Sequence, residues 1–194
     1  MSKAVMLSIR PKWVEKIANG EKTIEVRKAR PNIATPFKCY IYCTLPKYPH
    51  EDFIATNYPM PQFYGGGKVV GEFTCDRIYE IRKRGIPENF DYCYLSLNEW
   101  GNDDIETEIR AISASCVSKE ELNAYGDKAP LLYGWHISDL LIYDQPRELS
   151  EFQRATDPCD SCHAEYTWEC TDCKKFGGNI KRPPQSWRYV ETLF

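Results

Sequence analysis

The sequence lacks the long hydrophobic runs that mark membrane proteins. No segment of its 194 residues approaches the roughly 20 apolar residues that a membrane-spanning helix needs. The N-terminal stretch MSKAVMLSIRPKW has no apolar run long enough for a signal peptide and becomes charged at once. We therefore expect a cytoplasmic protein that does not associate with membranes.

The sequence also has no internal repeat and no low-complexity run. With 42% hydrophobic and 13% aromatic residues its composition is ordinary for a folded protein, and 11 Gly and 13 Pro fit a turn-rich β architecture better than a helical bundle. A chain of this length buries one core well but does not comfortably hold two full domains. We expect one domain over residues 1–149 and an appendage over residues 150–194.

Lys and Arg are missing from the stretch Glu88 to Glu108, which contains seven acidic residues. Residues 1–30 have the opposite bias, with eight basic residues against three acidic ones. The formal net charge of -3 therefore hides an uneven distribution. A protein that is acidic overall can still present a basic surface to phosphate, although scattered solvated charge is the alternative.

The first thirty residues predict a strand, a helix and a second strand. Alternating apolar residues predict a half-buried strand over residues 5–9, and Pro11 suits the first turn of a helix. Asn19 and Gly20 form a typical helix stop. Alternation resumes from Lys22 to Lys28, with Ile24 and Val26 on one face.

The rest of the chain predicts mainly strands with one further helix. The expected elements are a core strand at Phe37–Leu45, a long irregular insertion at Pro46–Gly67, a long strand at Lys68–Ile81 with a bulge at Gly71, a capped helix from Ser118 to Gly126, and one or two closing strands at Tyr133–Tyr143. Strands interleaved with short helices indicate an α+β domain built on a curved or closed sheet.

The segment Gly20-x-Lys22-x-x-Glu25-x-Arg27 places three charges inside an apolar strand pattern. Lys22 and Arg27 could hold a phosphate while Glu25 accepts a hydrogen bond from an amine, or Lys22 and Glu25 could form a catalytic pair. A simple Arg27–Glu25 ion pair is the third possibility. Strict alternation turns Lys22 away from Glu25, so cooperation requires Lys22 to belong to the turn after Gly20.

The motifs LSIRPKW, GEKTIEVR, GKVVGEFTCDRI and YGWHISDLLIY, with a strand that ends Tyr42-Cys43-Thr44, resemble the ASCH domain family of the PUA-like superfamily. The resemblance covers roughly residues 1–149. It implies a PUA-like open β-barrel with short flanking helices and a polar cleft that binds RNA, single-stranded nucleic acid, or a modified nucleoside or nucleotide. The ligand-binding residues expected for that cleft are Ser8, Arg10, Lys12, Trp13, Lys22, Glu25, Arg27 and Thr44.

Some members of this family are hydrolases that deacetylate N-acetylated cytidine with a Lys, a Thr and a Glu. Lys22 occupies the position of that Lys, whereas Glu25 stands where the family has Thr. The catalytic Glu of the family falls in the helical part, where Glu120, Glu121 or an upstream acidic residue could serve. The resemblance thus implies an RNA- or nucleotide-binding protein, with a hydrolase of acylated cytidine or of RNA acting through Lys22 and Glu25 as the alternative.

Two C-x-x-C pairs follow the domain, Cys159 with Cys162 and Cys170 with Cys173. Four thiolates at this spacing predict one tetrahedral structural zinc ion, which would help a short tail to fold on the barrel. Redox-active or reduced pairs and disulfides are the alternatives. The five remaining cysteines lie in mostly apolar, strand-like context and are expected to be small buried hydrophobes.

The end of the chain combines basic residues with Trp187 and Tyr189. This combination could extend a nucleic-acid surface by phosphate contact and base stacking. Alternatively, Ile180, Val190 and the two aromatic residues pack back onto the barrel. An adaptor role, in which the Pro46–Gly67 loop and the acidic region bind a protein, is a further hypothesis.

Overall fold

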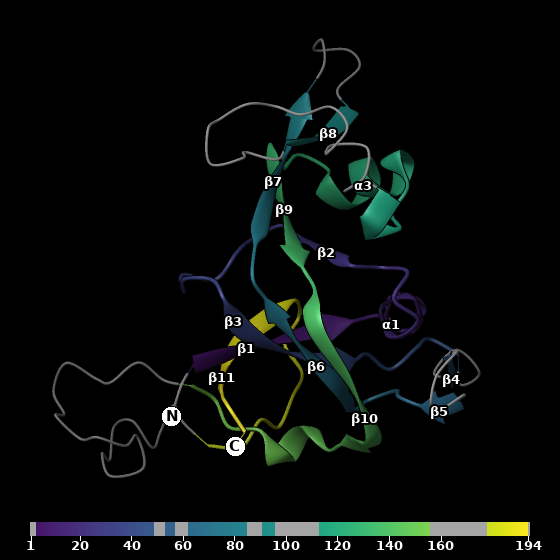
Figure 1. Ribbon diagram of the computed structural model, residues 1–194, viewed down its shortest axis with the longest axis vertical. Helices are drawn as coiled ribbons and strands as arrows, with labels where there is room; N and C mark the ends of the chain where they lie inside the picture. The colour runs from purple at the N-terminus through teal and green to yellow at the C-terminus, as the bar shows by residue number, and fades with distance from the viewer. Residues whose placement is uncertain are drawn as a thin grey trace, which may run out of the picture. The chain divides into compact units, whose positions relative to one another are not determined.

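The computed structural model of the protein describes residues 3–48, 53–56, 62–84, 91–95, 113–155 and 178–193. It consists mostly of strands with a few short helices, which confirms the predicted α+β class (Figure 1). The chain divides into two compact units, each built around one sheet. The first unit contains Met1–Glu15, Phe37–Phe73 and Leu140–Phe194, and the second contains Lys16–Pro36 and Thr74–Asp139.

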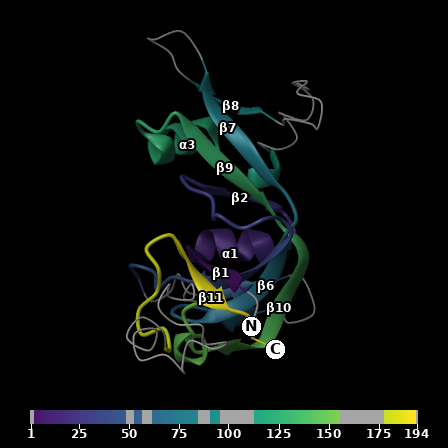
Figure 2. The same ribbon diagram turned by 90° about the vertical axis from the view of Figure 1, so that its left-hand side faces the viewer.

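A five-stranded sheet forms the first unit. Its strands, in spatial order, are β10 (Ser138–Arg147), β6 (Val69–Cys75), β3 (Phe37–Cys43), β1 (Lys3–Ile9) and β11 (Trp187–Glu191). Strand β1 runs parallel to β3 and antiparallel to β11, beside which it lies in Figure 2. Because β1 is central and covered on both faces, its residues from Ala4 to Ile9 are all buried rather than half-buried as their alternation predicts.

One face of this sheet packs into a hydrophobic core whose residues come from segments far apart in the sequence. Its members are Ala4, Met6, Tyr40, Tyr42, Val69, Phe152, Ile180 and Val190. Ile180 and Val190 belong to the C-terminal segment, so the end of the chain supplies both an edge strand and core side chains. This observation favours packing over free exposure for these two residues.

Helix α1 (Pro11–Ala18) begins and ends where the sequence predicts. Val14 and Ile17 form its buried apolar stripe. Gly20 has φ +72°, a left-handed conformation that glycine adopts at low cost and that ends the helix.

The insertion between β3 and β6 is not wholly irregular, so that prediction was wrong. Strands β4 (Phe53–Ala55) and β5 (Gln62–Tyr64) pair antiparallel as a small two-stranded sheet. Proline and glycine dominate the sequence of the insertion and conceal two strands of three residues each. Ile54 and Phe63 are buried opposite each other, which gives this small sheet an apolar contact.

A four-stranded sheet forms the second unit, in the order β2 (Ile24–Arg27), β9 (Leu131–His136), β7 (Ile78–Arg84) and β8 (Asp91–Leu95). Helix α3 (Lys119–Gly126) lies against it, as Figure 1 shows, and its Leu122 packs among Ile24, Val26, Ile81 and Leu132. The predicted capping box is present at the start of this helix. The helix thus covers the apolar face of the sheet.

The predicted single strand Lys68–Ile81 is in fact two strands, β6 and β7, which belong to different sheets. Asp76 and Arg77 separate them. The carbonyl of Arg77 accepts a hydrogen bond from the His136 amide, and His136 Nδ1 lies 2.6 Å from Asp76 Oδ1. These polar contacts interrupt an apolar pattern that reads as continuous in the sequence.

Among the described residues, no helix has both the length and the apolar character needed to cross a membrane. Cys39, Cys43 and Cys75 are buried and take part in no disulfide, as their apolar context predicts, whereas Cys116 is half-buried. Burial raises the pKa of the Cys75 thiol to about 12, so this side chain acts as a small apolar group.

Candidate ligand-binding site

Lys22 lies in the turn after α1 and not in β2, which is the condition for it to meet Glu25. Its backbone amide donates to the carbonyl of Lys16, so this residue closes the end of the helix. Its side chain then turns inward and is only 2% exposed. The Nζ atom donates to the carbonyl of Ile24 at 2.8 Å and to that of Ser115 at 2.6 Å.

Glu25 bridges the two cations of the motif. Its Oε2 lies 3.3 Å from Lys22 Nζ, and its Oε1 lies 3.0 Å from Arg27 Nη2. Glu25 and Arg27 are 6% and 7% exposed, and all four residues of β2 are buried. The three charged side chains therefore form one compact buried network in the second unit.

The network constrains what Lys22 can do chemically. Three oxygens surround Nζ, which matches the three N–H bonds of an ammonium group. A nucleophilic amine needs a free lone pair, so catalysis by Lys22 would require a proton to leave this network first. In the arrangement observed, Lys22 acts as a hydrogen-bond donor that ties β2 to Ser115.

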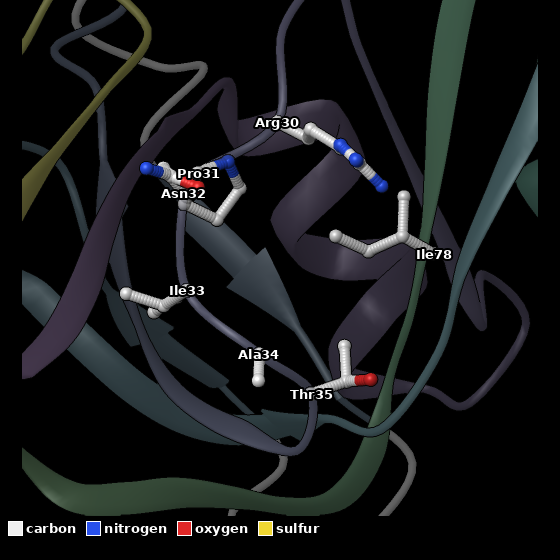
Figure 3. Close-up of a pocket in the computed structure, with 7 residues that line it drawn as sticks. All are labelled: Arg30, Pro31, Asn32, Ile33, Ala34, Thr35 and Ile78. Carbon is white, nitrogen blue, oxygen red and sulfur yellow. The ribbon is translucent and has the colours of Figure 1, made fainter.

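A pocket opens on the segment that follows β2, within the same unit. It encloses about 460 Å³, and Figure 3 shows the Arg30 side chain reaching across it toward Ile78. Its lining residues are Arg30, Pro31, Asn32, Ile33, Ala34, Thr35 and Ile78. The volume falls in the range typical of small-molecule sites, whereas the surface that lines the pocket is mainly polar.

Sequence analysis did not identify this pocket. The run Arg30-Pro31-Asn32, which directly follows a charged strand, could have indicated it. Proline and asparagine favour a turn with a stiff backbone, and such a turn holds a basic side chain at the surface, where it can meet a ligand. Asn32 and Thr35 are exposed in the structure, as is Arg30. The segment therefore offers a guanidinium, an amide and a hydroxyl to a ligand.

The other predicted ligand-binding residues lie in the first unit, near the ends of β1 and β3. These strands run parallel with Ile9 opposite Cys43, so the residues that follow, Arg10 and Thr44, emerge at the same edge of the sheet. The Thr44 amide donates to the Ile9 carbonyl at 2.8 Å, which fixes this edge. Arg10 is exposed and Thr44 half-buried.

Lys12 and Trp13 form a cation–π pair on the first turn of α1. The Lys12 Nζ atom lies 4.3 Å from the centre of the Trp13 ring. Lys12 is exposed and Trp13 is half-buried, so the indole is neither a core anchor nor a fully open surface. Two cations and an aromatic ring thus gather in the short stretch from Arg10 to Trp13.

Ser8 has a different environment from these neighbours. It is 8% exposed, and its hydroxyl donates to the carbonyl of Pro184 at 2.6 Å. Its backbone amide donates to the carbonyl of Ser186. In this structure Ser8 fastens the C-terminal segment to β1.

A second polar cluster, which sequence analysis did not predict, lies on the first sheet around Glu72. Lys38 Nζ donates to Glu72 Oε1 at 2.7 Å, and the Tyr143 hydroxyl donates to Oε2 at 2.6 Å. Burial by itself would raise the pKa of Glu72, but these hydrogen bonds outweigh it and leave the pKa below its usual value. Burial and the same carboxylate raise the pKa of Tyr143.

The predicted zinc ligands, Cys159, Cys162, Cys170 and Cys173, lie outside the described residues. Within the described ranges, no three His, Cys, Asp or Glu side chains are arranged to hold a metal ion. The zinc prediction therefore stays a prediction.

Comparison with known proteins gives a match in structure only. No protein-family model matches the chain, and no curated protein matches its sequence. The crystal structure of ASCH from Zymomonas mobilis matches with a TM-score of 0.54 and 15% identity, covering 97% of this chain and 88% of that one. The chain has the ASCH fold. This confirms the predicted architecture.

Crystal structures of two single-residue variants of the Zymomonas mobilis protein agree with this result. A tyrosine-to-phenylalanine variant matches with a TM-score of 0.53, covering 98% of this chain and 92% of that one, at 15% identity. A serine-to-alanine variant matches with a TM-score of 0.54, covering 97% and 89%, also at 15% identity. At this identity the likeness establishes the fold alone.

Proposed function

We propose that the protein binds RNA or a modified nucleotide or nucleoside, and that the pocket of residues 30–35 receives it. The observation that carries the proposal is the combination in one pocket of about 460 Å³ of Arg30, Asn32 and Thr35 with Ile33 and Ile78. A nucleotide presents the matching groups, namely a phosphate, hydrogen-bonding edges and a flat apolar base. The ASCH fold is consistent with the binding of nucleic acid or a nucleotide.

Each lining group has a suitable partner on such a ligand. The Arg30 guanidinium suits a phosphate because it can donate two parallel hydrogen bonds. The Asn32 amide both donates and accepts, as recognition of a base edge requires, and the Thr35 hydroxyl can bond a ribose. Ile33 and Ile78 offer apolar contact to a base.

The buried network supports this pocket in the proposal. Arg27 precedes Arg30 by three residues, and its ion pair with Glu25 fixes the end of β2 from which the pocket segment departs. Lys22, Glu25 and Arg27 thus act as positioning residues. A site held by buried, mutually bonded side chains keeps its geometry when the ligand is absent.

The first unit has its own residues that suit an RNA chain. Arg10 and Lys12 can neutralise phosphates, and the half-buried face of Trp13 can stack on a base. Thr44 at the same edge can donate a hydrogen bond. Ser8 takes part indirectly, because its hydroxyl holds the backbone at Pro184.

Mass spectrometry of nucleosides and RNA that co-purify with the protein tests the proposal without assuming a ligand. We expect an enriched nucleoside, nucleotide or RNA species that is lost from Arg30→Gln. The matched control is Arg82→Gln, since Arg82 lies in the same unit but already pairs with Glu80. Recovery of the same amount of nucleoside, nucleotide or RNA from the wild type and from both variants would refute the pocket as the binding site.

A second candidate function, hydrolysis, draws on the 3.3 Å contact between Lys22 and Glu25. In this alternative the pair transfers protons while water attacks the amide of an N-acetylated cytidine or a phosphodiester of RNA. We expect Lys22→Met to abolish turnover with the circular dichroism spectrum retained. A panel of acylated cytidines and RNAs left intact by the pure wild-type protein would refute this alternative.

A structural zinc ion bound by the four cysteines of the two C-x-x-C pairs completes the proposal. Zinc would serve the folding of the C-terminal region and take no part in ligand chemistry.

A further inference from the structure

Two arginines share one face at the C-terminal edge of the five-stranded sheet. Arg188 in β11 lies opposite Met6, and Val190 lies opposite Ala4. An isolated bridge places Arg154 opposite Val190 on the outer side of β11. Because alternate residues of a strand share a face, and cross-strand partners do too, both arginines point to the same side as Val190.

The Arg188 guanidinium has no anionic partner in the described part of the chain. Its Nε and Nη1 atoms are buried without a hydrogen-bond acceptor. Burial, followed by the charge of Arg154, lowers the pKa of Arg188. Buried donors without acceptors and neighbouring like charges both oppose folding, so an anion that reached the Arg188 guanidinium would relieve both costs.

Among the described residues, the charges nearby do not supply that anion. Residues 151–155 and 178–193 contain four cations and two carboxylates, of which Glu151 pairs with Arg147. Glu191 lies opposite Lys3, and strand alternation turns it to the face away from Arg188. Exposed Lys181 and Arg182 follow Ile180, which packs in the same core cluster as Val190.

We propose that Arg154 and Arg188 form a phosphate-binding site that holds the backbone of single-stranded RNA. Two guanidinium groups on the same face suit the oxygens of a phosphate, which accept several charge-assisted hydrogen bonds. Further cations at Lys181 and Arg182 fit a repeating phosphate chain better than a lone anion. The identity of the polymer rests on the proposed function, whereas the oxyanion chemistry does not.

We expect this site to contact the phosphate backbone of the RNA and not its bases. Trp187 and Tyr189 stack edge to face with ring centres 5.4 Å apart, but they lie on the opposite face of β11 from Arg188. An aromatic platform is therefore not combined with these two arginines. Binding at this site should be independent of RNA sequence.

Thermal unfolding with inorganic phosphate tests the oxyanion site alone. At equal ionic strength, phosphate at ten times its Kd should raise the Tm of the wild-type protein about 3 °C above that in chloride. Arg188→Gln should lose this rise while remaining as stable as wild type in chloride, because it removes an unpartnered buried cation. The control Arg147→Gln should retain the rise, since Arg147 has Glu151 as a partner and lies over the Tyr143 ring.

RNA binding at several salt concentrations then identifies the source of the phosphate. For a single-stranded homopolymer, Arg188→Gln should lower the slope of log K against log salt by about 0.7, and weaken binding about 5- to 10-fold at low salt. Arg147→Gln removes the same charge and should leave the slope unchanged. The same loss for Arg188→Gln on two unrelated RNA sequences would support backbone recognition.

The outcomes separate the two proposals. Phosphate stabilisation that depends on Arg188, without RNA binding, supports the oxyanion site, overturns RNA as its ligand and restricts the proposed function to a nucleotide or nucleoside in the pocket. RNA binding that Arg188→Gln and Arg147→Gln weaken equally overturns this inference and leaves the pocket proposal standing. An identical phosphate response in wild type and Arg188→Gln also overturns it.

Discussion

Neutralising Glu25 tests whether the buried network holds the second unit together. The substitution Glu25→Gln keeps the shape of the side chain but removes the only negative charge shared by Lys22 and Arg27 in the network. Both cations are less than a tenth exposed, so neither can turn to water without unfolding this region. Breaking a buried ion pair by removing one partner typically costs 3–5 kcal/mol.

The structure places the expected loss near the lower end of that range, at about 3 kcal/mol. Lys22 keeps the carbonyls of Ile24 and Ser115 as acceptors, so the loss falls mainly on Arg27, whose Nη2 atom lies 3.0 Å from Glu25 Oε1. A loss of this size is a large fraction of the 5–15 kcal/mol that stabilises a typical domain. The unfolding midpoint in urea should fall clearly.

Equilibrium unfolding in urea measures this loss, with tryptophan fluorescence and circular dichroism as probes. Trp135 is fully buried and pairs directly with Glu25 across β2 and β9, so it reports on the affected region. The control is Glu21→Gln, whose partner Lys16 is partly exposed, and which should cost less than about 1 kcal/mol. An equal, small loss in both variants would refute the reasoning, and a gain in stability for Glu25→Gln would indicate a functional cluster kept at the expense of stability.

Three further predictions concern other parts of the chain. Purified protein should contain about one zinc ion per chain by elemental analysis, and Cys170→Ser should lose it; a metal-free wild type would refute the zinc site. The lowered pKa of Glu72 means that its carboxylate adds stability above the ordinary Glu pKa of about 4.3, which is lost as the pH falls through the lower folded value. Glu72→Gln should therefore flatten the fall in stability at acid pH, and an unchanged profile would contradict this. Gly71→Ala should lower the free energy of unfolding by about 1–3 kcal/mol, because the added Cβ would lie 2.5 Å from the backbone oxygen of Leu141. An unchanged urea midpoint would contradict this, since it would mean that β6 and β10 move apart without loss of stability.

Helices α1 and α3 could be predicted closely because their signals are local. Pro11 and Gly20 bound α1 through their own backbone preferences, and Ser118 with Glu121 fixes the start of α3. The break between β6 and β7 could not be predicted in the same way. It depends on a hydrogen bond from His136, sixty residues away, to Asp76.

The candidate site shows the same limit. Alternation leaves the contact of Lys22 with Glu25 undecided, because it depends on whether the strand starts before or after Lys22. Ser115, ninety-three residues from Lys22, supplies the carbonyl that draws the side chain inward. The pocket around Arg30 combines a turn with Ile78 from a distant strand, a proximity that no local pattern encodes.

The most direct test of the account is equilibrium binding of labelled single-stranded RNA and a panel of nucleotides at low salt. We predict measurable affinity that declines as salt rises, is weakened by Arg30→Gln, and is unchanged by Arg82→Gln. No affinity of the folded wild-type protein for any RNA, nucleotide or modified nucleoside in the panel would contradict the central claim.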